Sequence, residues 1–122
     1  MKLTFGSRPR VAIDLEPGCY ILPCDSAIGK SYLCSLLKKV SDRERVNSHS
    51  FPDKFHPEDI LDSSRFDIVM LDRYDMRDKD YVDEMREFVR KGALLLDCKS
   101  MVFPLPCKMS EIWMSKNELI VG

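Results

Sequence analysis

Residues 24–31 have the residue types and the spacing of a loop that holds phosphate. They read Cys-Asp-Ser-Ala-Ile-Gly-Lys-Ser and fit the pattern G-x-x-x-x-G-K-[ST] from its second position onward. In such a loop, backbone N–H groups surround an anion and the next helix points its N-terminus at the same anion. A lysine then reaches the phosphates, and a hydroxyl reaches a bound Mg²⁺. The expected phosphate contacts are Cys24, Asp25, Ser26, Ala27, Ile28, Gly29, Lys30, Ser31 and Tyr32.

Cys24 is the departure from the pattern, because it stands where the first glycine is expected. That position needs a close approach of the backbone more than a particular side chain, and cysteine is small. The alternative is a chance Gly-Lys-Ser, since glycine and serine are common at helix starts. The context favours the loop, because an apolar strand at 19–22 precedes it and an amphipathic helix at 30–40 follows it.

A second feature is the sequence Ile-Val-Met-Leu-Asp, which ends at Asp72. Four consecutive apolar residues are typical of a strand buried on both faces of a parallel sheet. Alone, Asp72 would be interpreted as a polar residue at a strand end. Together with the loop, it is interpreted as the carboxylate that holds Mg²⁺ beside the phosphates, so Ser31 and Asp72 are the expected metal ligands.

The segments "CDSAIGKS" and "IVMLD" resemble the P-loop NTPase superfamily. The preceding segment "VAIDLEPGCYILPC" resembles the strand-turn-strand entry to the loop in ATP-binding-cassette and related (AAA-like) ATPase domains. The resemblance implies a three-layer α/β core that binds a nucleoside triphosphate, ATP more than GTP, with Mg²⁺. It also implies that Lys30 contacts the phosphates and that Ser31 and Asp72 contact the metal.

The sequence also departs from that family after the second motif. Many such ATPases carry glutamate directly after the strand-end aspartate, and this chain has Arg73 there. Asp75 could replace the glutamate if the strand end turns favourably, so Asp72 and Asp75 are the candidate catalytic residues. Residues 97–100 occupy the place where relatives carry a γ-phosphate sensor, and Lys99 or Ser100 could serve, although an ordinary strand-to-loop turn is the better interpretation. No L-S-G-G-Q segment is present.

The pattern along the chain predicts one α/β domain over residues 1–122 with a mainly parallel sheet, because strands and helices alternate. Pro17-Gly18 predicts an N-terminal hairpin that joins strands 11–15 and 19–22. Residues 111–121 predict a C-terminal hairpin that turns at 115–117. The other expected elements are helices at 30–40, 56–64 and 77–92, and strands at 46–51, 66–72, 93–98 and 101–103.

Composition restricts the class of protein. The net charge of −1 argues against general nucleic-acid binding. No apolar run approaches the roughly 18 residues of a membrane span, and the first ten residues lack the core of a signal peptide, so we expect a cytoplasmic protein. The five cysteines include no C-x-x-C pair. Neither zinc nor a disulfide framework is expected, and Cys19, Cys34 and Cys98 are interpreted as small buried apolar residues.

Three functions remain open. The first is a nucleotide-binding protein whose hydrolysis is slow or depends on a partner, which could be another protein or a second copy. The second is a non-catalytic protein that keeps the fold and acts through protein contacts, such as an accessory or regulatory factor of a mobile element or phage. An exposed Trp113 would indicate a partner surface. The third, a small-molecule or nucleotide kinase, ranks last because strands occupy the part of the chain where a lid would lie.

Overall fold

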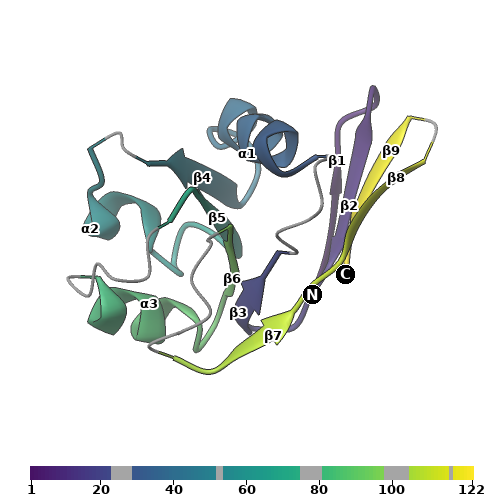
Figure 1. The fold of residues 1–122 in the computed structure, drawn as a ribbon. Coiled ribbons are helices and arrows are strands. Elements are labelled where there is room, and N and C mark those ends of the chain that lie inside the picture. Colours follow the sequence, from purple (N-terminus) through teal and green to yellow (C-terminus); the bar gives the residue numbers. More distant parts are fainter. Residues whose placement is uncertain (23–28, 52–53, 75–80, 98–104, 116) are drawn as a thin grey trace.

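The computed structural model describes residues 1–22, 29–51, 54–74, 81–97, 105–115 and 117–122. Within these residues the chain forms two sheets and three helices, which stack in layers (Figure 1). Several sequence-based predictions lie outside the described residues: those for Cys24, Asp25, Ser26, Ala27, Ile28, Asp75, Cys98, Lys99, Ser100 and the strand at 101–103.

The larger sheet has five strands in the order β4-β5-β6-β3-β7, and every neighbouring pair is parallel. This confirms an α/β fold built on a parallel sheet. The central strands are apolar and buried throughout, as β5 shows, because layers cover both faces of the sheet. The strands are β3 (Gly18–Ile21), β4 (Val46–Ser50), β5 (Ile68–Asp72), β6 (Ala93–Leu96) and β7 (Cys107–Met109).

Alternate residues of these strands feed two separate cores. On one face, Met70 and Leu95 pack with Leu33 and Leu37 of α1 (Lys30–Lys39) and with the second sheet. On the other face the strands pack against α2 (Pro57–Ile60) and α3 (Val82–Phe88). Figure 1 shows α1 on the same side of the parallel sheet as the second sheet, and α2 and α3 on the opposite side.

The second sheet corrects the predicted N-terminal hairpin. Its order is β1-β2-β9-β8, and β2 pairs with β1 and β9, whereas β3 belongs to the parallel sheet. The two strands separate because β3 is apolar on both faces, whereas β2 alternates buried and exposed residues and needs cover on one face only. The real N-terminal hairpin is β1–β2. The strands are β1 (Lys2–Phe5), β2 (Arg10–Asp14), β8 (Ile112–Ser115) and β9 (Glu118–Val121).

Several other predictions are confirmed. The C-terminal hairpin is present as the antiparallel pair β8–β9, and Asn117 in its turn has φ 80°. The short strand expected at 46–51 is β4, and α2 begins at Pro57 as expected. Cys19 and Cys34 are buried. α2 and α3 end at Ile60 and Phe88, earlier than the predicted 64 and 92, and residues 77–80 of the predicted helix at 77–92 lie outside the described residues. After Phe88 the chain turns toward Gly92, whose N–H donates to the Phe88 carbonyl. No helix in the described ranges has the length and apolar character to cross a bilayer.

Candidate functional site

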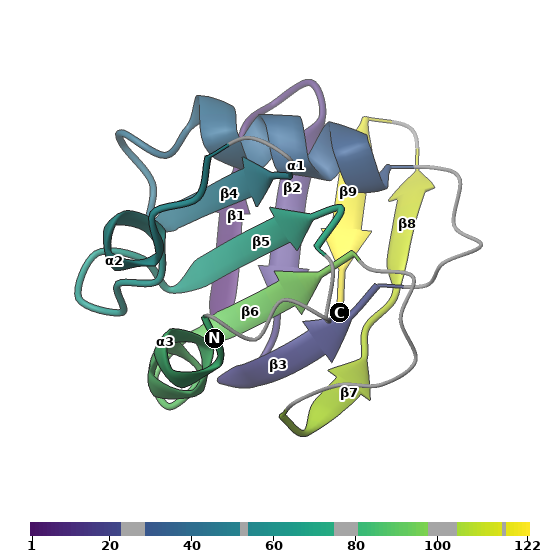
Figure 2. The same ribbon diagram turned by 60° about the vertical axis from the view of Figure 1, so that its left-hand side comes forward.

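Those motif residues that the structure describes lie at one edge of the parallel sheet, where its strands end. Because all its strands run the same way, their carboxyl ends lie together, and this edge is where α/β sheets usually bind ligands. Figure 2 shows the arrowheads of β3, β4, β5 and β6 pointing toward this edge. We use the name polar corner for five residues that the fold contributes here: Lys30, Ser31, Ser50, Asp72 and Asp97.

Gly29 fixes where α1 begins. Its φ of 95° lies in the left-handed region that favours glycine. A Cβ at this position would lie 3.4 Å from Cδ1 of Ile112 and 3.8 Å from Cδ1 of Leu119, so the start of α1 packs closely on the second sheet. The N-cap residue Gly29 has no side chain to cap the helix, none of the described residues provides a side-chain cap, and the first turn of α1 carries no acidic residue. The N-terminus of α1 therefore keeps the electrostatic character that suits an anion.

Lys30 contacts Asp97 rather than open solvent. Its Nζ lies 3.0 Å from Oδ1 of Asp97, which follows β6, and the two side chains are only 14% and 19% exposed. The ion pair joins the first turn of α1 to the end of the strand beside β3. A lysine in this position is charge-compensated without a ligand, and it would have to leave Asp97 to reach a phosphate.

Asp72 is the most buried acid of the polar corner, with 3% of its surface exposed. Its Oδ2 accepts a weak hydrogen bond from Ser50 Oγ at 3.4 Å. When both carboxyls of the corner are ionised, Oδ1 of Asp72 has no donor among the described residues. A proton retained on Asp72 would supply the missing interaction by hydrogen-bonding to Asp97, and a bound cation would supply it equally well.

The two carboxyls differ in acidity. Burial raises the pKa of Asp72, and the hydrogen bond and negative charge of Asp97 raise it further. Burial also raises the pKa of Asp97, but hydrogen bonds from Asp72, Lys30 and the Arg73 N–H, with the charge of Lys30, turn the net shift downward. Asp72 is therefore the weaker acid of a pair that shares its protons.

Arg73 has an unusual backbone that the same acid stabilises. Its φ of 58° is in the left-handed region, which is uncommon for a residue other than glycine, asparagine or aspartate. The Arg73 N–H donates to the Asp97 carboxylate, and the N–H of Tyr74 donates to the Asp97 carbonyl at 2.9 Å. Asp97 therefore positions both Lys30 and the turn after β5.

The structure brings together three of the predicted site residues, Lys30, Ser31 and Asp72; Ser31 and Asp72 line one cavity of about 380 Å³. Tyr32 lies on the first turn of α1 with an exposed side chain and does not line that cavity. Asp97 lies in the segment 97–100 that was expected to hold a γ-phosphate sensor, but no role of its own was predicted for it. A signal was available, because "ALLLD" repeats the pattern of "IVMLD", four apolar residues followed by aspartate.

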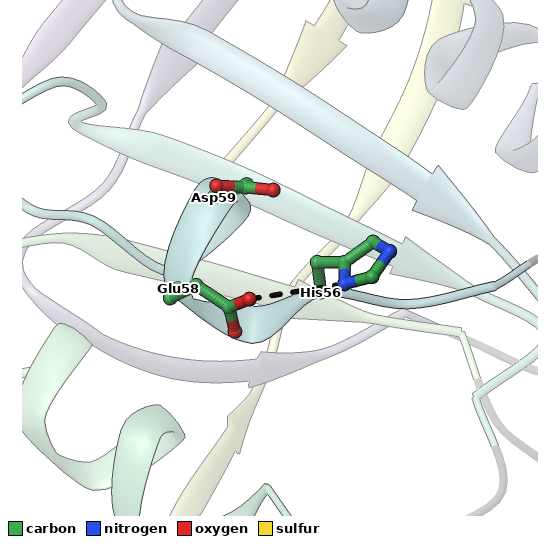
Figure 3. A group of neighbouring side chains, drawn as sticks. All are labelled: His56, Glu58 and Asp59. Carbon is green, nitrogen blue, oxygen red and sulfur yellow. Dashed lines mark ion pairs between the residues drawn. The ribbon is translucent and has the colours of Figure 1, made fainter.

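A separate group of potential metal ligands lies on α2, outside the polar corner. Figure 3 shows His56, Glu58 and Asp59 around the first turn of α2, and we call them the exposed cluster. Their ligand atoms lie within 4.8 Å of one another, and His56 Nδ1 is 3.7 Å from Glu58 Oε1. All three side chains are exposed, so water satisfies their polar atoms and nothing in their surroundings requires a cation.

Comparisons with models of protein families, with curated proteins and with solved structures find no match. What the site can do is therefore argued from its own residues. Carboxylate and hydroxyl oxygens are the ligands that Mg²⁺ prefers, and the polar corner offers them from Ser31, Ser50, Asp72 and Asp97. Oδ1 of Asp72, which lacks a donor among the described residues when both acids are ionised, fits such an ion.

Proposed function

We propose that the polar corner binds a nucleoside triphosphate, ATP in preference to GTP, together with Mg²⁺. The observation that carries the proposal is the buried Asp72 carboxylate beside Asp97, at the edge where α1 begins. When both acids are ionised, its Oδ1 has no donor among the described residues. A buried carboxylate of this kind costs stability unless a proton or a cation completes it. Binding of a metal together with its nucleotide would explain why this buried carboxylate is present.

Four residues of the corner have distinct roles in this proposal. Ser31 and Asp72 hold the Mg²⁺, directly or through water. Lys30 exchanges Asp97 for the terminal phosphates of the nucleotide, so binding requires the 3.0 Å ion pair to open. Asp97 then accepts the Arg73 N–H and stands close to the metal. The open N-terminus of α1 adds the partial positive charge of its first turn.

Hydrolysis is proposed to be slow or to depend on a partner. The residue after Asp72 is Arg73, which cannot act as a base toward an attacking water. Asp72 has a raised pKa, but its place in the proposal is on the metal. Transition-state charge in phosphoryl transfer can instead be stabilised by an arginine from another protein.

The direct test is calorimetric titration of the protein with ATP and with GTP, in the presence and absence of Mg²⁺. We expect Mg²⁺-dependent binding that is lost in Lys30→Ala and retained in the matched variant Lys39→Ala, because Lys39 is exposed on the last turn of α1. Absence of binding by the wild type at millimolar nucleotide would contradict the proposal. Equal affinity in Lys30→Ala and wild type would contradict the role of Lys30.

One observation favours the second function, a non-catalytic protein that acts through protein contacts. Trp113 and Met114 are 46% and 43% exposed on β8, which is an edge strand of its sheet. Large apolar side chains on an exposed edge favour contact with another chain. This function requires no nucleotide, so it gains support if the wild type fails to bind ATP and GTP in the titration above.

A further inference from the structure

The cavity beside the polar corner extends beyond the residues of the corner. It measures about 380 Å³ and lies between α1 and the carboxyl ends of β4 and β5. The proposed function assigns roles to only two of the residues that line the cavity, Ser31 and Asp72. The lining residues are Ser31, Cys34, Ser35, Lys38, Ser48, His49, Ser50, Asp72 and Arg73.

The cavity runs along α1 away from the nucleotide end. Ser31 and Lys38 both line it, and they are seven residues apart on one helix. At 1.5 Å per residue, this separation corresponds to about 10 Å along the helix axis. A nucleotide whose terminal phosphate reaches Ser31 would therefore leave the part of the cavity near Lys38 for another ligand.

The charges of the wall favour an anion in that part. Lys38 comes from the last turn of α1 and Arg73 from the turn after β5, so two cations reach the cavity from different elements. His49 adds an imidazole whose ring packs against Phe51 and Phe55, at centroid distances of 4.9 and 5.0 Å.

Among the described residues the wall contains one acid, Asp72, at the end where the proposed metal binds. The backbone of Arg73 is in the left-handed region and is held there by its N–H hydrogen bond to Asp97. Non-glycine residues in this conformation cost free energy and cluster at ligand sites. The same acid that pairs with Lys30 thus fixes the turn from which the second cation emerges.

We propose that this cavity binds the phosphate group of a second small molecule, a phosphate monoester, next to the terminal phosphate of the nucleotide. Lys38 and Arg73 contact the phosphate oxygens, which suit charge-assisted hydrogen bonds from two directions. The serine hydroxyls keep the remaining wall polar, and the Mg²⁺ on Asp72 offsets the one negative charge. This inference rests on the proposed function for the identity of the neighbouring ligand, but phosphate binding in the cavity can be measured without any nucleotide.

The test is an NMR titration of the ¹⁵N-labelled full chain with inorganic phosphate, which reports on each backbone amide. We expect saturable shifts at the amides of Lys38, Ser48, His49, Ser50 and Arg73. The double variant Lys38→Gln/Arg73→Asn should bind phosphate about tenfold more weakly or worse at these amides, because two charged hydrogen-bond donors are lost. Asparagine is chosen because it tolerates the left-handed backbone of residue 73.

The matched control is Lys39→Gln/Arg43→Asn, which removes the same charge from exposed positions that do not line the cavity. It should leave the phosphate affinity unchanged. Shifts confined to Gly29, Lys30 and Ser31 would overturn the inference and leave the proposed function intact. Absence of saturable shifts at the cavity amides, or equal weakening by both double variants, would also overturn it. If the wild type binds phosphate in the cavity but shows no Mg²⁺-dependent binding of ATP in calorimetry, the result contradicts the proposed function and leaves the phosphate site standing.

Discussion

Two groups of potential metal ligands in the described part of the chain have opposite surroundings. In the polar corner, Asp72 and Asp97 are mostly buried, and Oδ1 of Asp72 finds no donor among the described residues when both acids are ionised. In the exposed cluster, the His56 and Glu58 side chains are 48% and 70% exposed. The exposed cluster is the one whose ligand atoms are known to lie within 4.8 Å of one another. Proximity alone therefore does not identify a cation site.

The difference arises from the elements that carry the acids. The ends of β5 and β6 are covered by α1 on one face and by the second core on the other, so their aspartates lose water. Glu58 and Asp59 follow Pro57 in the first turn of a short helix, where acids interact favourably with the backbone N–H groups and remain hydrated. The position of the acids in the exposed cluster is therefore explained without a metal. In the polar corner, by contrast, burial leaves an ionised Asp72 incompletely hydrogen-bonded by the described residues.

The largest expected effect is on metal-dependent binding. Asp72→Asn should weaken Mg²⁺-dependent ATP binding by about 100-fold or more, because an anionic ligand of the metal becomes neutral. Calorimetry with and without Mg²⁺ isolates the metal-dependent part. The paired variant Asp59→Asn, in the exposed cluster, should bind as the wild type does. If the two variants behave alike, the contrast between the clusters has no functional meaning.

The next effect concerns stability. Asp97→Asn should lower the free energy of unfolding by about 2 kcal/mol at neutral pH, because Lys30 loses its ion pair in a mostly buried place. Asp72→Asn should raise it by about 1 kcal/mol, because a desolvated carboxylate is replaced by a neutral amide. Urea unfolding of the two variants beside the wild type measures both. Destabilisation by Asp72→Asn at neutral pH would show that its carboxylate is well solvated by the fold.

These opposite effects should both disappear in acid. The pKa of Asp72 is raised in the fold, so its favourable contribution is present below the ordinary carboxyl pKa and is lost as the pH rises through the folded value. The pKa of Asp97 is lowered, so its contribution is present above the ordinary value and is lost as the pH falls through the folded value. Unfolding measured from neutral to acidic pH should therefore show both variants converging on the wild type. A gap that does not change with pH would indicate packing rather than charge.

The sequence predicted four of the five strands of the parallel sheet, and strands such as "IVMLD" and "ALLLD" were clear because they are short and apolar. It did not predict β7, which has only three residues and is not fully buried. It did not predict which sheet each N-terminal strand joins. Pro17-Gly18 favours a turn, but a turn does not determine whether the next strand pairs with the previous one. The pairing depends on whether one or both faces of a strand must be buried. β3 is buried on both faces, and the layers that cover them come from distant parts of the chain.

The candidate site was predicted in part for a similar reason. Lys30, Ser31 and Asp72 follow from local motifs, so their types and spacing could be recognised in the chain. The role of Asp97 depends on β6 lying between β3 and β5, which places it next to both Lys30 and Asp72. Strand order is a long-range property, and no local pattern encodes it. The repeated strand-aspartate pattern becomes informative only once the two strands are known to be neighbours.

The smallest expected effect tests the other side of the comparison. Glu58→Gln should change the free energy of unfolding by no more than about 0.5 kcal/mol, because it removes only an exposed charge near the start of a four-residue helix. Urea unfolding at low and at high salt measures this change, and salt should reduce it further. A change comparable to that of Asp97→Asn, or protection of the wild type by a divalent cation that Glu58→Gln abolishes, would contradict this prediction. The exposed cluster would then hold a metal despite its hydration, and burial would no longer separate the two groups of ligands.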